Sequence, residues 1–321
     1  MIRSIEFRAM NTTVMLAAEG ERAIEGMQAA KIFIDECEQR FSRFLPASEV
    51  TELNHFAGEW VTISDELFEM LQLSVKYHQE TNGLFDPTIL RDLKRVGYDR
   101  SMDDIRLNGV KENSLESTRT SGAAFREIEL DLVEKRVRLP HGLEIDLNGI
   151  AKGWIVERAA KLLNQSVDVC GVSAGGDILF IGQPSDGMDW DVYLEDPRDP
   201  MQMLAQLHMS SGAVATSSVM KRSWTQGTVN RHHLIDPRTG EPAKADWLSM
   251  TVLAPNIIEA DVYAKALLIG GWNEVSKLLK TKASLTFIAV DSMGHLVGSP
   301  NYKDYIYEPA TDIFLSTRIT S

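Results

Sequence analysis

The chain has 321 residues, with 33 Lys and Arg against 46 Asp and Glu, and therefore a formal net charge of −13. This acidic balance argues against general nucleic-acid binding, which needs a basic surface to neutralise phosphates. Hydrophobic residues make up 44 % and charged residues 25 %, which is typical of a soluble globular protein with a large core. The two cysteines, Cys37 and Cys170, are too few for a disulfide framework or a zinc site. We expect both to be small buried hydrophobes.

The length predicts two domains or one domain with two lobes, because domains average roughly 150 residues. No apolar run approaches the roughly 18 residues that span a bilayer. Residues 1–8 also lack the apolar core and cleavage site of a signal peptide. We therefore expect a cytoplasmic protein with no membrane span, although an exported chain that had lost its leader would look the same.

The first half of the chain alternates between strand-like and helical patterns. Residues 5–18 predict one strand, rich in residues that favour extended backbone. Residues 21–41 predict a helix, because apolar side chains recur every three or four positions. A second helix is predicted from Ser64 to about Asn82-Gly83, a natural left-handed cap. Residues 99–126 are polar and irregular, and indicate a loop-rich surface connection.

The second half begins with a predicted hairpin over 128–139, with its turn at Glu134-Lys135. A strand over 143–147 then leads through Asn148-Gly149 into a helix at 150–164. The remaining predicted elements are strands at 178–181, 190–195, 232–236, 249–254 and 284–291, and helices at 257–269 (capped by Asn256) and 273–280. This irregular alternation favours an α+β fold over a parallel, doubly wound sheet.

The segment from Asp146 to Gly153 places small residues and a lysine where a helix begins. Cations are disfavoured at a helix N-terminus, so Lys152 requires an anionic partner there. The free N–H groups of the helix start would suit a phosphate. The alternative, a strand–helix turn with a solvated lysine, is favoured when the segment is taken alone.

Two further segments carry glycines or paired charges. Ser173 to Asp177 contains two glycines, but neither a phosphate-binding P-loop nor a dinucleotide fingerprint is present, and a tight turn is the simpler interpretation. Asp261 and Lys265 share one helix face at i and i+4. An ordinary surface ion pair would explain them, but the small apolar neighbours indicate a partly buried face.

The segment from Arg231 to Gly240 combines two histidines with a turn signal at Asp236-Pro237. Adjacent residues of a strand point to opposite faces, so at most one of His232 and His233 faces a site. A hairpin with a surface histidine is an equally good interpretation. Thr81 to Thr88 forms a rigid turn that displays a carboxylate.

Taken in chain order, these segments resemble the ApbE family of flavin transferases. Each motif is weak alone, and their common order over most of the chain makes the resemblance specific. The motifs are Phe7-Arg8-Ala9-Met10-Asn11-Thr12, Phe41-Ser42-Arg43-Phe44 with Ser48-Glu49 and Leu53-Asn54, Thr81 to Thr88, Asp146 to Gly153, Ala174-Gly175-Gly176-Asp177, Ala215-Thr216-Ser217, His233 to Gly240 with Pro242, and Ala260-Asp261.

The resemblance implies one ApbE-like domain over residues 1–321, with an α+β fold of two related lobes and FAD bound between them. It implies FAD:protein FMN transferase activity with FAD and Mg²⁺. The FMN part would move onto a threonine hydroxyl of an acceptor flavoprotein, and AMP would leave. The alternatives are a pyrophosphatase that splits FAD into FMN and AMP, and an FAD-binding protein without transferase activity.

The resemblance also implies site residues. The expected FAD contacts are Met10, Leu84, Phe85, Asp86, Asp146, Lys152 and Ile235. The family's metal positions fall at Gly149 (through its carbonyl), Asp261, Ala264 and Lys265. Asp261 and His233 are the catalytic candidates, with His233 accepting or steering the threonine proton. Because the protein is acidic, we expect positive charge to be concentrated in one cleft around 146–152 and 261–265.

Two positions depart from the family pattern. Asn11 stands where the family usually has glycine, and we expect a small effect because asparagine tolerates left-handed backbone. Lys265 stands where the family usually has a threonine that helps to ligate Mg²⁺. A charged ammonium has no lone pair to offer a metal. The hypothesis is that Lys265 weakens or replaces the metal ion.

Overall fold

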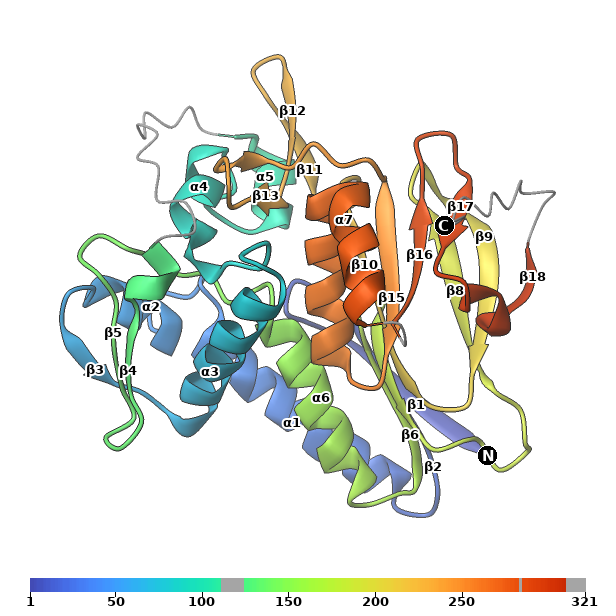
Figure 1. Cartoon of the computed structure of the whole chain (residues 1–321). Coiled ribbons are helices and arrows are strands. Elements are labelled where there is room, and N and C mark those ends of the chain that lie inside the picture. Colours follow the sequence, from blue (N-terminus) through green and yellow to red (C-terminus); the bar gives the residue numbers. More distant parts are fainter. Residues whose placement is uncertain (111–123, 283–284, 310–321) are drawn as a thin grey trace. The chain divides into compact units, whose positions relative to one another are not determined.

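The computed structural model describes residues 1–110, 124–282 and 285–309 (Figure 1). Two compact units divide the chain, and each is formed by segments that are distant in sequence. Unit 1 comprises Met1–Ile34, Gly153–Lys221 and Ala245–Ser321, and unit 2 comprises Asp35–Lys152 and Arg222–Lys244.

Unit 1 is built on an eight-stranded sheet of order β1-β2-β6-β7-β10-β15-β16-β17. All of its described strand pairs are antiparallel, which confirms the predicted α+β class. The strands are β1 (Ile2–Ala9), β2 (Thr12–Glu19), β6 (Val169–Ala174), β7 (Asp177–Ile181), β10 (Gly212–Ser218), β15 (Ser249–Ala254), β16 (Thr286–Val290) and β17 (Leu296–Gly298).

The sheet of unit 1 lies between helices and a second, smaller sheet (Figure 1). One face carries α6 (Ala151–Asn164), α7 (Ile257–Thr281) and the first part of α1 (Ala23–Phe41). The other face packs on the sheet β18-β9-β8 through a common apolar core. The strands of the smaller sheet are β8 (Trp190–Asp196), β9 (Asp199–Met209) and β18 (Ile306–Pro309), and η3 (Tyr302–Tyr305) precedes β18.

One sequence prediction for unit 1 needs correction. Residues 5–18 form a hairpin and not one strand, because Met10 and Asn11 both have φ of 54° and reverse the chain between Ala9 and Thr12. The left-handed backbone expected at Asn11 is confirmed. The two helices predicted at 257–269 and 273–280 are confirmed within α7, because the backbone between them is non-helical at Gly271, where φ is 65°.

Unit 2 contains short helices, a small sheet and two hairpins. The helices are α2 (Glu49–His55), α3 (Asp65–Glu80), η1 (Pro87–Ile89), α4 (Leu90–Arg95), α5 (Met102–Asn108) and η2 (Ala124–Glu127). The sheet has the order β3-β5-β4 (Trp60–Thr62, Arg136–Arg138 and Glu129–Asp131). The hairpins are β11–β12 (Ser223–Gln226, Val229–His232) and β13–β14 (Ile235–Asp236, Glu241–Pro242).

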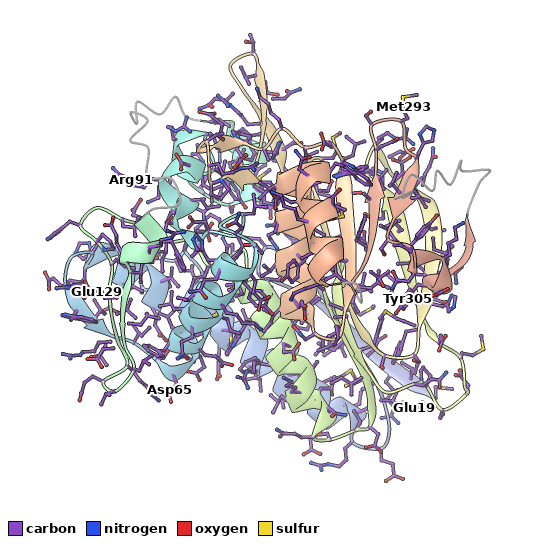
Figure 2. The ribbon with its side chains drawn as sticks, in the orientation of Figure 1. Glu19, Asp65, Arg91, Glu129, Met293 and Tyr305 are labelled. Atoms are coloured by element: carbon purple, nitrogen blue, oxygen red, sulfur yellow. The ribbon has the colours of Figure 1, made fainter. Side chains whose placement is uncertain are left out.

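Ion pairs connect the sheet of unit 2 to its neighbours at the surface. Within the sheet, Arg138 of β5 pairs with Glu129 of β4 at 2.5 Å, and Lys135 connects the sheet to Asp65 of α3 at 2.6 Å. Glu129 and Asp65 are labelled in Figure 2. Such exposed pairs contribute roughly 0–1 kcal/mol each. The stability of the unit therefore depends mainly on its buried apolar clusters, one of which gathers side chains of α4, α5, β11 and β13.

Local signals in unit 2 predicted several elements correctly. Ser64 caps α3 by accepting a hydrogen bond from the Leu67 N–H, and Asn82 and Gly83 after the helix both have positive φ. The hairpin over 128–139 is present as β4 and β5. The loop predicted over 99–126 is wrong at Met102–Asn108, which form α5 behind the cap Ser101, while 111–123 lie outside the described residues.

No helix among the described residues combines the length and the apolar character that crossing a bilayer requires.

Candidate functional site

The turn that follows α3 is fixed by its own side chains. The Thr81 hydroxyl donates to the Tyr77 carbonyl at 2.7 Å and accepts from the Phe85 N–H at 3.0 Å. The His78 ring nitrogen Nδ1 lies 3.0 Å from the Phe85 carbonyl oxygen. These bonds give the predicted FAD contacts Leu84 and Phe85 one defined backbone path, in a region that is buried.

Asp86 ends this turn as a buried carboxylate. Its Oδ1 accepts hydrogen bonds from the Thr88 N–H at 2.8 Å and the Thr88 hydroxyl at 2.6 Å. Its Oδ2 has no hydrogen-bond partner among the described residues and lies 3.9 Å from His78 Nδ1. Burial raises the pKa of Asp86 above its ordinary value, against the opposing effect of the Thr88 hydrogen bonds.

The segment that carries Asp146 is extended but does not belong to a strand. The prediction of a strand over 143–147 is therefore wrong. The Asn54 side chain takes the place of a partner strand, because its amide donates to the Ile145 carbonyl at 2.9 Å and accepts from the Ile145 N–H at 2.8 Å. The Asp146 N–H donates to the Pro87 carbonyl at 2.7 Å. This last bond joins the predicted FAD contacts Asp146 and Asp86 within unit 2.

Asp146 is also paired with a residue to which the sequence assigned no role. The Arg43 Nε lies 3.0 Å from Asp146 Oδ2, and both side chains are buried. Arg43 lies two residues after the end of α1 and belongs to the motif Phe41-Ser42-Arg43-Phe44 of the family resemblance, which gave it no role.

Helix α6 begins as predicted, with Lys152 in its first turn directly after the turn that contains Gly149. The next residue, Gly153, packs against α7. A Cβ atom at Gly153 would lie 3.2 Å from Ile258 Cα and 3.5 Å from Asp261 Cβ. The glycine that ends this motif is therefore explained by the close approach of two helices beside Asp261.

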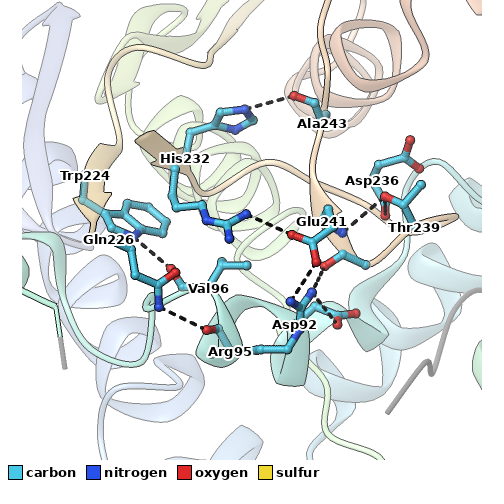
Figure 3. Close-up of polar contacts among 12 residues, drawn as sticks. Asp92, Arg95, Val96, Trp224, Gln226, His232, Asp236, Thr239, Glu241 and Ala243 are labelled. Carbon is cyan, nitrogen blue, oxygen red and sulfur yellow. Dashed lines mark hydrogen bonds and ion pairs between the residues drawn. The ribbon is translucent and has the colours of Figure 1, made fainter. Parts of the chain in front are cut away.

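The segment that carries His233 and Ile235 is bound to α4 by a polar network (Figure 3). Glu241 accepts from Arg95 at 2.8 Å through Oε1 and from Arg231 at 2.9 Å through Oε2. Arg95 also donates to the Gly240 carbonyl at 2.5 Å. The network fixes the β13–β14 hairpin, in which the predicted turn after Asp236 is present.

The two adjacent histidines have different surroundings. His232 Nε2 donates to the Ala243 carbonyl at 3.1 Å, while its Nδ1 accepts from the Leu234 N–H at 3.3 Å (Figure 3). Burial lowers the pKa of His232, which fits this neutral form. The His233 ring instead lies edge-on to Tyr98, with 6.4 Å between ring centroids. The strand predicted over 232–236 is interrupted at 233–234, because β12 ends at His232 and β13 begins at Ile235.

Unit 1 contains a buried ion pair on α7, which Asn256 caps as predicted by accepting from the Glu259 N–H. The Lys265 ammonium contacts Asp261 Oδ1, and the Asp261 side chain is 3 % exposed. Asp261 Oδ2 has no hydrogen-bond partner among the residues that the structure describes. Ala264, one turn along the same helix, is fully buried.

The side chains at these positions do not fit Mg²⁺. The ion takes six oxygen ligands in a near-octahedral arrangement, and a charged ammonium repels it and offers no lone pair. Asp261 supplies one carboxylate, and Lys265 already pairs with one of its oxygens. Nowhere in the described ranges do three or more His, Cys, Asp or Glu side chains form a group that could hold a metal.

Met10, the predicted FAD contact in unit 1, lies in the left-handed turn between β1 and β2. The Gly175 N–H donates to the Thr13 carbonyl at 3.0 Å, and a Cβ atom at Gly175 would lie 2.5 Å from Thr12 Oγ1. The segment 173–177 is thus a tight hairpin turn, as the simpler interpretation predicted, and its glycines permit this close approach to the Met10 turn.

The predicted site residues therefore divide between the units. Unit 1 contains Met10, Asp261, Ala264 and Lys265, and unit 2 contains Leu84, Phe85, Asp86, Asp146, Gly149, Lys152, His233 and Ile235. Within each unit the contacts above join several of them. That 146–152 and 261–265 form one cleft stays a prediction.

Comparison with known proteins gives the chain a family. The sequence model of the ApbE family matches residues 10–289, which is most of the chain. The chain belongs to the ApbE family. ApbE relatives with a named activity include the FAD:protein FMN transferase of Treponema pallidum, 27 % identical over 253 residues, which are 73 % of this chain and 68 % of the relative. The enzyme of that name from Vibrio cholerae is 28 % identical over 244 residues, or 74 % of this chain and 71 % of the relative.

Solved ApbE structures share the fold. The ApbE protein of Thermotoga maritima has a TM-score of 0.85 and 25 % identity, and the match covers 96 % of this chain and 100 % of that one. The flavin transferase ApbE of Vibrio cholerae has a TM-score of 0.79 and 19 % identity, with 95 % and 99 % covered. The α+β fold expected from the motifs is therefore confirmed.

Proposed function

We propose that this protein is an FAD:protein FMN transferase that moves FMN from FAD onto a threonine hydroxyl of an acceptor flavoprotein and releases AMP. The observation that carries the proposal is the ApbE family match over residues 10–289, together with relatives that bear this activity in their names.

The reaction is a phosphoryl transfer. The threonine oxygen forms a bond to the phosphorus of the FMN part, and the bond from that phosphorus to the bridging oxygen breaks. The bridging oxygen leaves with AMP, and the threonine proton passes to a base. Such transfers depend mainly on in-line positioning and on stabilisation of charge on the phosphate oxygens.

In this proposal, Met10, Leu84, Phe85, Asp86, Asp146, Lys152 and Ile235 contact FAD. Lys152 and the N–H groups at the start of α6 face the pyrophosphate, which relieves the unfavourable position of a lysine at a helix N-terminus. His233 accepts the threonine proton, a role that suits the ordinary pKa range of histidine.

Asp261 and Lys265 form the second source of charge. The buried carboxylate holds the Lys265 ammonium in one place, so the charge is pre-positioned for an anionic phosphate. We propose that this fixed ammonium weakens or replaces the Mg²⁺ that the family resemblance implies at Gly149, Asp261, Ala264 and Lys265. No step of the proposed reaction passes through a metal ion.

The same ion pair favours a second candidate, an FAD-binding protein without transferase activity. A single ammonium cannot bridge two phosphate oxygens as a divalent ion does. FAD that stays intact for hours beside a competent acceptor would favour this candidate. AMP release that needs no acceptor would instead favour an FAD pyrophosphatase.

The deciding experiment incubates the full chain with FAD and an acceptor flavoprotein domain, in EDTA and in Mg²⁺. Mass spectrometry then measures covalent FMN on threonine, while chromatography measures AMP. The proposal expects equal amounts of the two products, and neither with an acceptor whose target threonine is replaced by alanine. The absence of flavinylation in both buffers would overturn it.

The role of Lys265 needs a matched pair of variants. Lys265→Thr restores a hydroxyl at the metal position, and we expect AMP release to become at least tenfold more dependent on Mg²⁺ than in wild type. Lys277→Thr is the control, because Lys277 lies on the same helix but is 67 % exposed and pairs only with Glu274 in the contacts described. A wild type that already depends fully on Mg²⁺, with a variant no faster, would contradict the role given to Lys265.

A further inference from the structure

Arg43 is a buried cation placed between two parts of the proposed site. Its side chain is 3 % exposed. Its Nε lies 3.0 Å from Asp146 Oδ2, and its Nη2 donates to the Tyr98 carbonyl at 3.1 Å. The Nε contact is an ion pair without an aligned hydrogen bond. A buried guanidinium is unfavourable unless charges and acceptors surround it, so this arrangement holds Arg43 in one orientation.

Two aromatic rings lie close to the Arg43 guanidinium. Its central carbon lies 4.2 Å from the Phe44 ring centroid and 4.8 Å from that of Tyr98. Tyr98 in turn stacks on Trp224 at 5.5 Å and meets His233 edge-on. One guanidinium thus contacts the predicted FAD contact Asp146 and also the ring that packs against the proposed base.

The position of Asp146 is set by these contacts. Its Oδ1 accepts from the Asn148 N–H at 2.8 Å, and its Oδ2 pairs with Arg43. Each carboxylate oxygen has a second lone pair, which a hydroxyl or amino donor can reach. The orientation of the carboxylate, and hence the direction of those lone pairs, depends on Arg43.

We propose that Arg43 is a positioning residue for FAD, because it fixes the Asp146 carboxylate in the orientation that accepts hydrogen bonds from the hydroxyl or amino groups of the dinucleotide. This inference rests on the proposed function and adds to it a residue that acts through Asp146. The described contacts of Arg43 are with Asp146, the Tyr98 carbonyl and two aromatic rings, so we assign it a role that acts through Asp146.

The chain offers a matched control three residues earlier. Arg40, in the last turn of α1, pairs with Glu49 at 2.8 Å and with Glu66 at 3.1 Å. Its side chain is 36 % exposed, and none of its described contacts involves Asp146. Arg40 and Arg43 therefore both connect α1 to the rest of unit 2, but only Arg43 is coupled to the proposed FAD contact.

The test is a double-mutant cycle read as the dissociation constant of FAD, measured by flavin fluorescence without an acceptor flavoprotein, so that no transfer occurs. We expect Arg43→Met and Asp146→Asn each to weaken FAD binding about tenfold, and the double variant to bind within twofold of either single one. Arg40→Met should change binding less than twofold, and its effect should add to that of Asp146→Asn.

A purely structural role for Arg43 predicts a different pattern. In that case the two losses of FAD affinity multiply in the double variant, or Arg40→Met and Arg43→Met lose equal affinity. Either result overturns the inference. Arg43→Lys keeps the charge but has one donor nitrogen in place of the planar guanidinium, so it should recover at least threefold of the affinity lost in Arg43→Met. It replaces Arg43→Met in the cycle if that variant does not fold. If wild type binds no FAD, the proposed function fails with the inference. If wild type binds FAD and the losses multiply, only the inference fails.

Discussion

Asp146 in unit 2 and Asp261 in unit 1 are two buried carboxylates that differ in how many of their oxygens have a partner. Their side chains are 6 % and 3 % exposed, and each pairs with a cation, Arg43 or Lys265. Both oxygens of Asp146 are engaged, by Arg43 and by the Asn148 N–H. Asp261 has one engaged oxygen, while its Oδ2 has no hydrogen-bond partner within the described residues.

The two carboxylates therefore differ in kind. Asp146 is fixed in one orientation by its partners, whereas Asp261 keeps one oxygen that can still accept a hydrogen bond. A buried acceptor without a donor costs about 1–3 kcal/mol, which a structural role does not explain. Asp261 therefore has the features of a catalytic group, whereas Asp146 has those of a group that binds a ligand in one defined orientation. The following predictions test that distinction, beginning with the largest effect.

Asp261→Asn should have the largest effect on activity. A neutral amide cannot hold the Lys265 ammonium as a carboxylate does, so we expect AMP release to fall at least a hundredfold while the protein stays folded. Chromatography of AMP and thermal unfolding measure the two quantities. Asp146→Asn is the comparison, and its loss should appear mainly in the KM for FAD. Activity within threefold of wild type for Asp261→Asn would remove the distinction.

Asp86 provides a third buried carboxylate, and its effect should appear in stability. Burial raises its pKa in the folded state, so the folded protein binds this proton more tightly than the unfolded chain. Its contribution to stability is therefore lost as pH rises through the interval between the unfolded and folded pKa values. We expect Asp86→Asn to raise the Tm by roughly 2 °C at pH 7, and the gain to shrink towards pH 4.

Asp65→Asn is the control for that measurement. Asp65 is exposed at the start of α3, where a negative charge is favourable, so its removal should leave the Tm unchanged or slightly lower. FAD affinity should fall for Asp86→Asn, because Asp86 is a proposed FAD contact. A Tm difference that is independent of pH would contradict the stated cause.

The smallest effect is expected at the cysteines. Burial raises the pKa of both thiols to about 12, so almost no thiolate forms near neutral pH. In the native protein at pH 8, a thiol-specific disulfide reagent should label neither Cys37 nor Cys170, and both should react after denaturation. Rapid labelling of a native thiol would show that its surroundings open to solvent, and would weaken arguments based on burial there.

Local signals predicted helices and strands alike where the signal lies within one stretch of sequence, as for the strands at 178–181, 190–195 and 249–254. The helix over 21–41 and the α3 helix capped by Ser64 were correct because their apolar spacing and caps lie within one stretch of sequence. The strand predicted over 5–18 was wrong because the left-handed turn at Met10-Asn11 lacks the usual glycine. The strand predicted over 143–147 was wrong because its partner is one side chain, Asn54.

The sequence by itself determined the family, the α+β class and the residue types of the candidate site, because motif order and local periodicity are properties of the chain in one dimension. Only the tertiary structure revealed Arg43 beside Asp146, the rings of Tyr98 and His233 in contact, and the Asp261 oxygen that has no hydrogen-bond partner in the part of the chain that the structure describes. These features depend on contacts between residues far apart in the chain, and on which polar atoms folding removes from water, neither of which sequence spacing encodes.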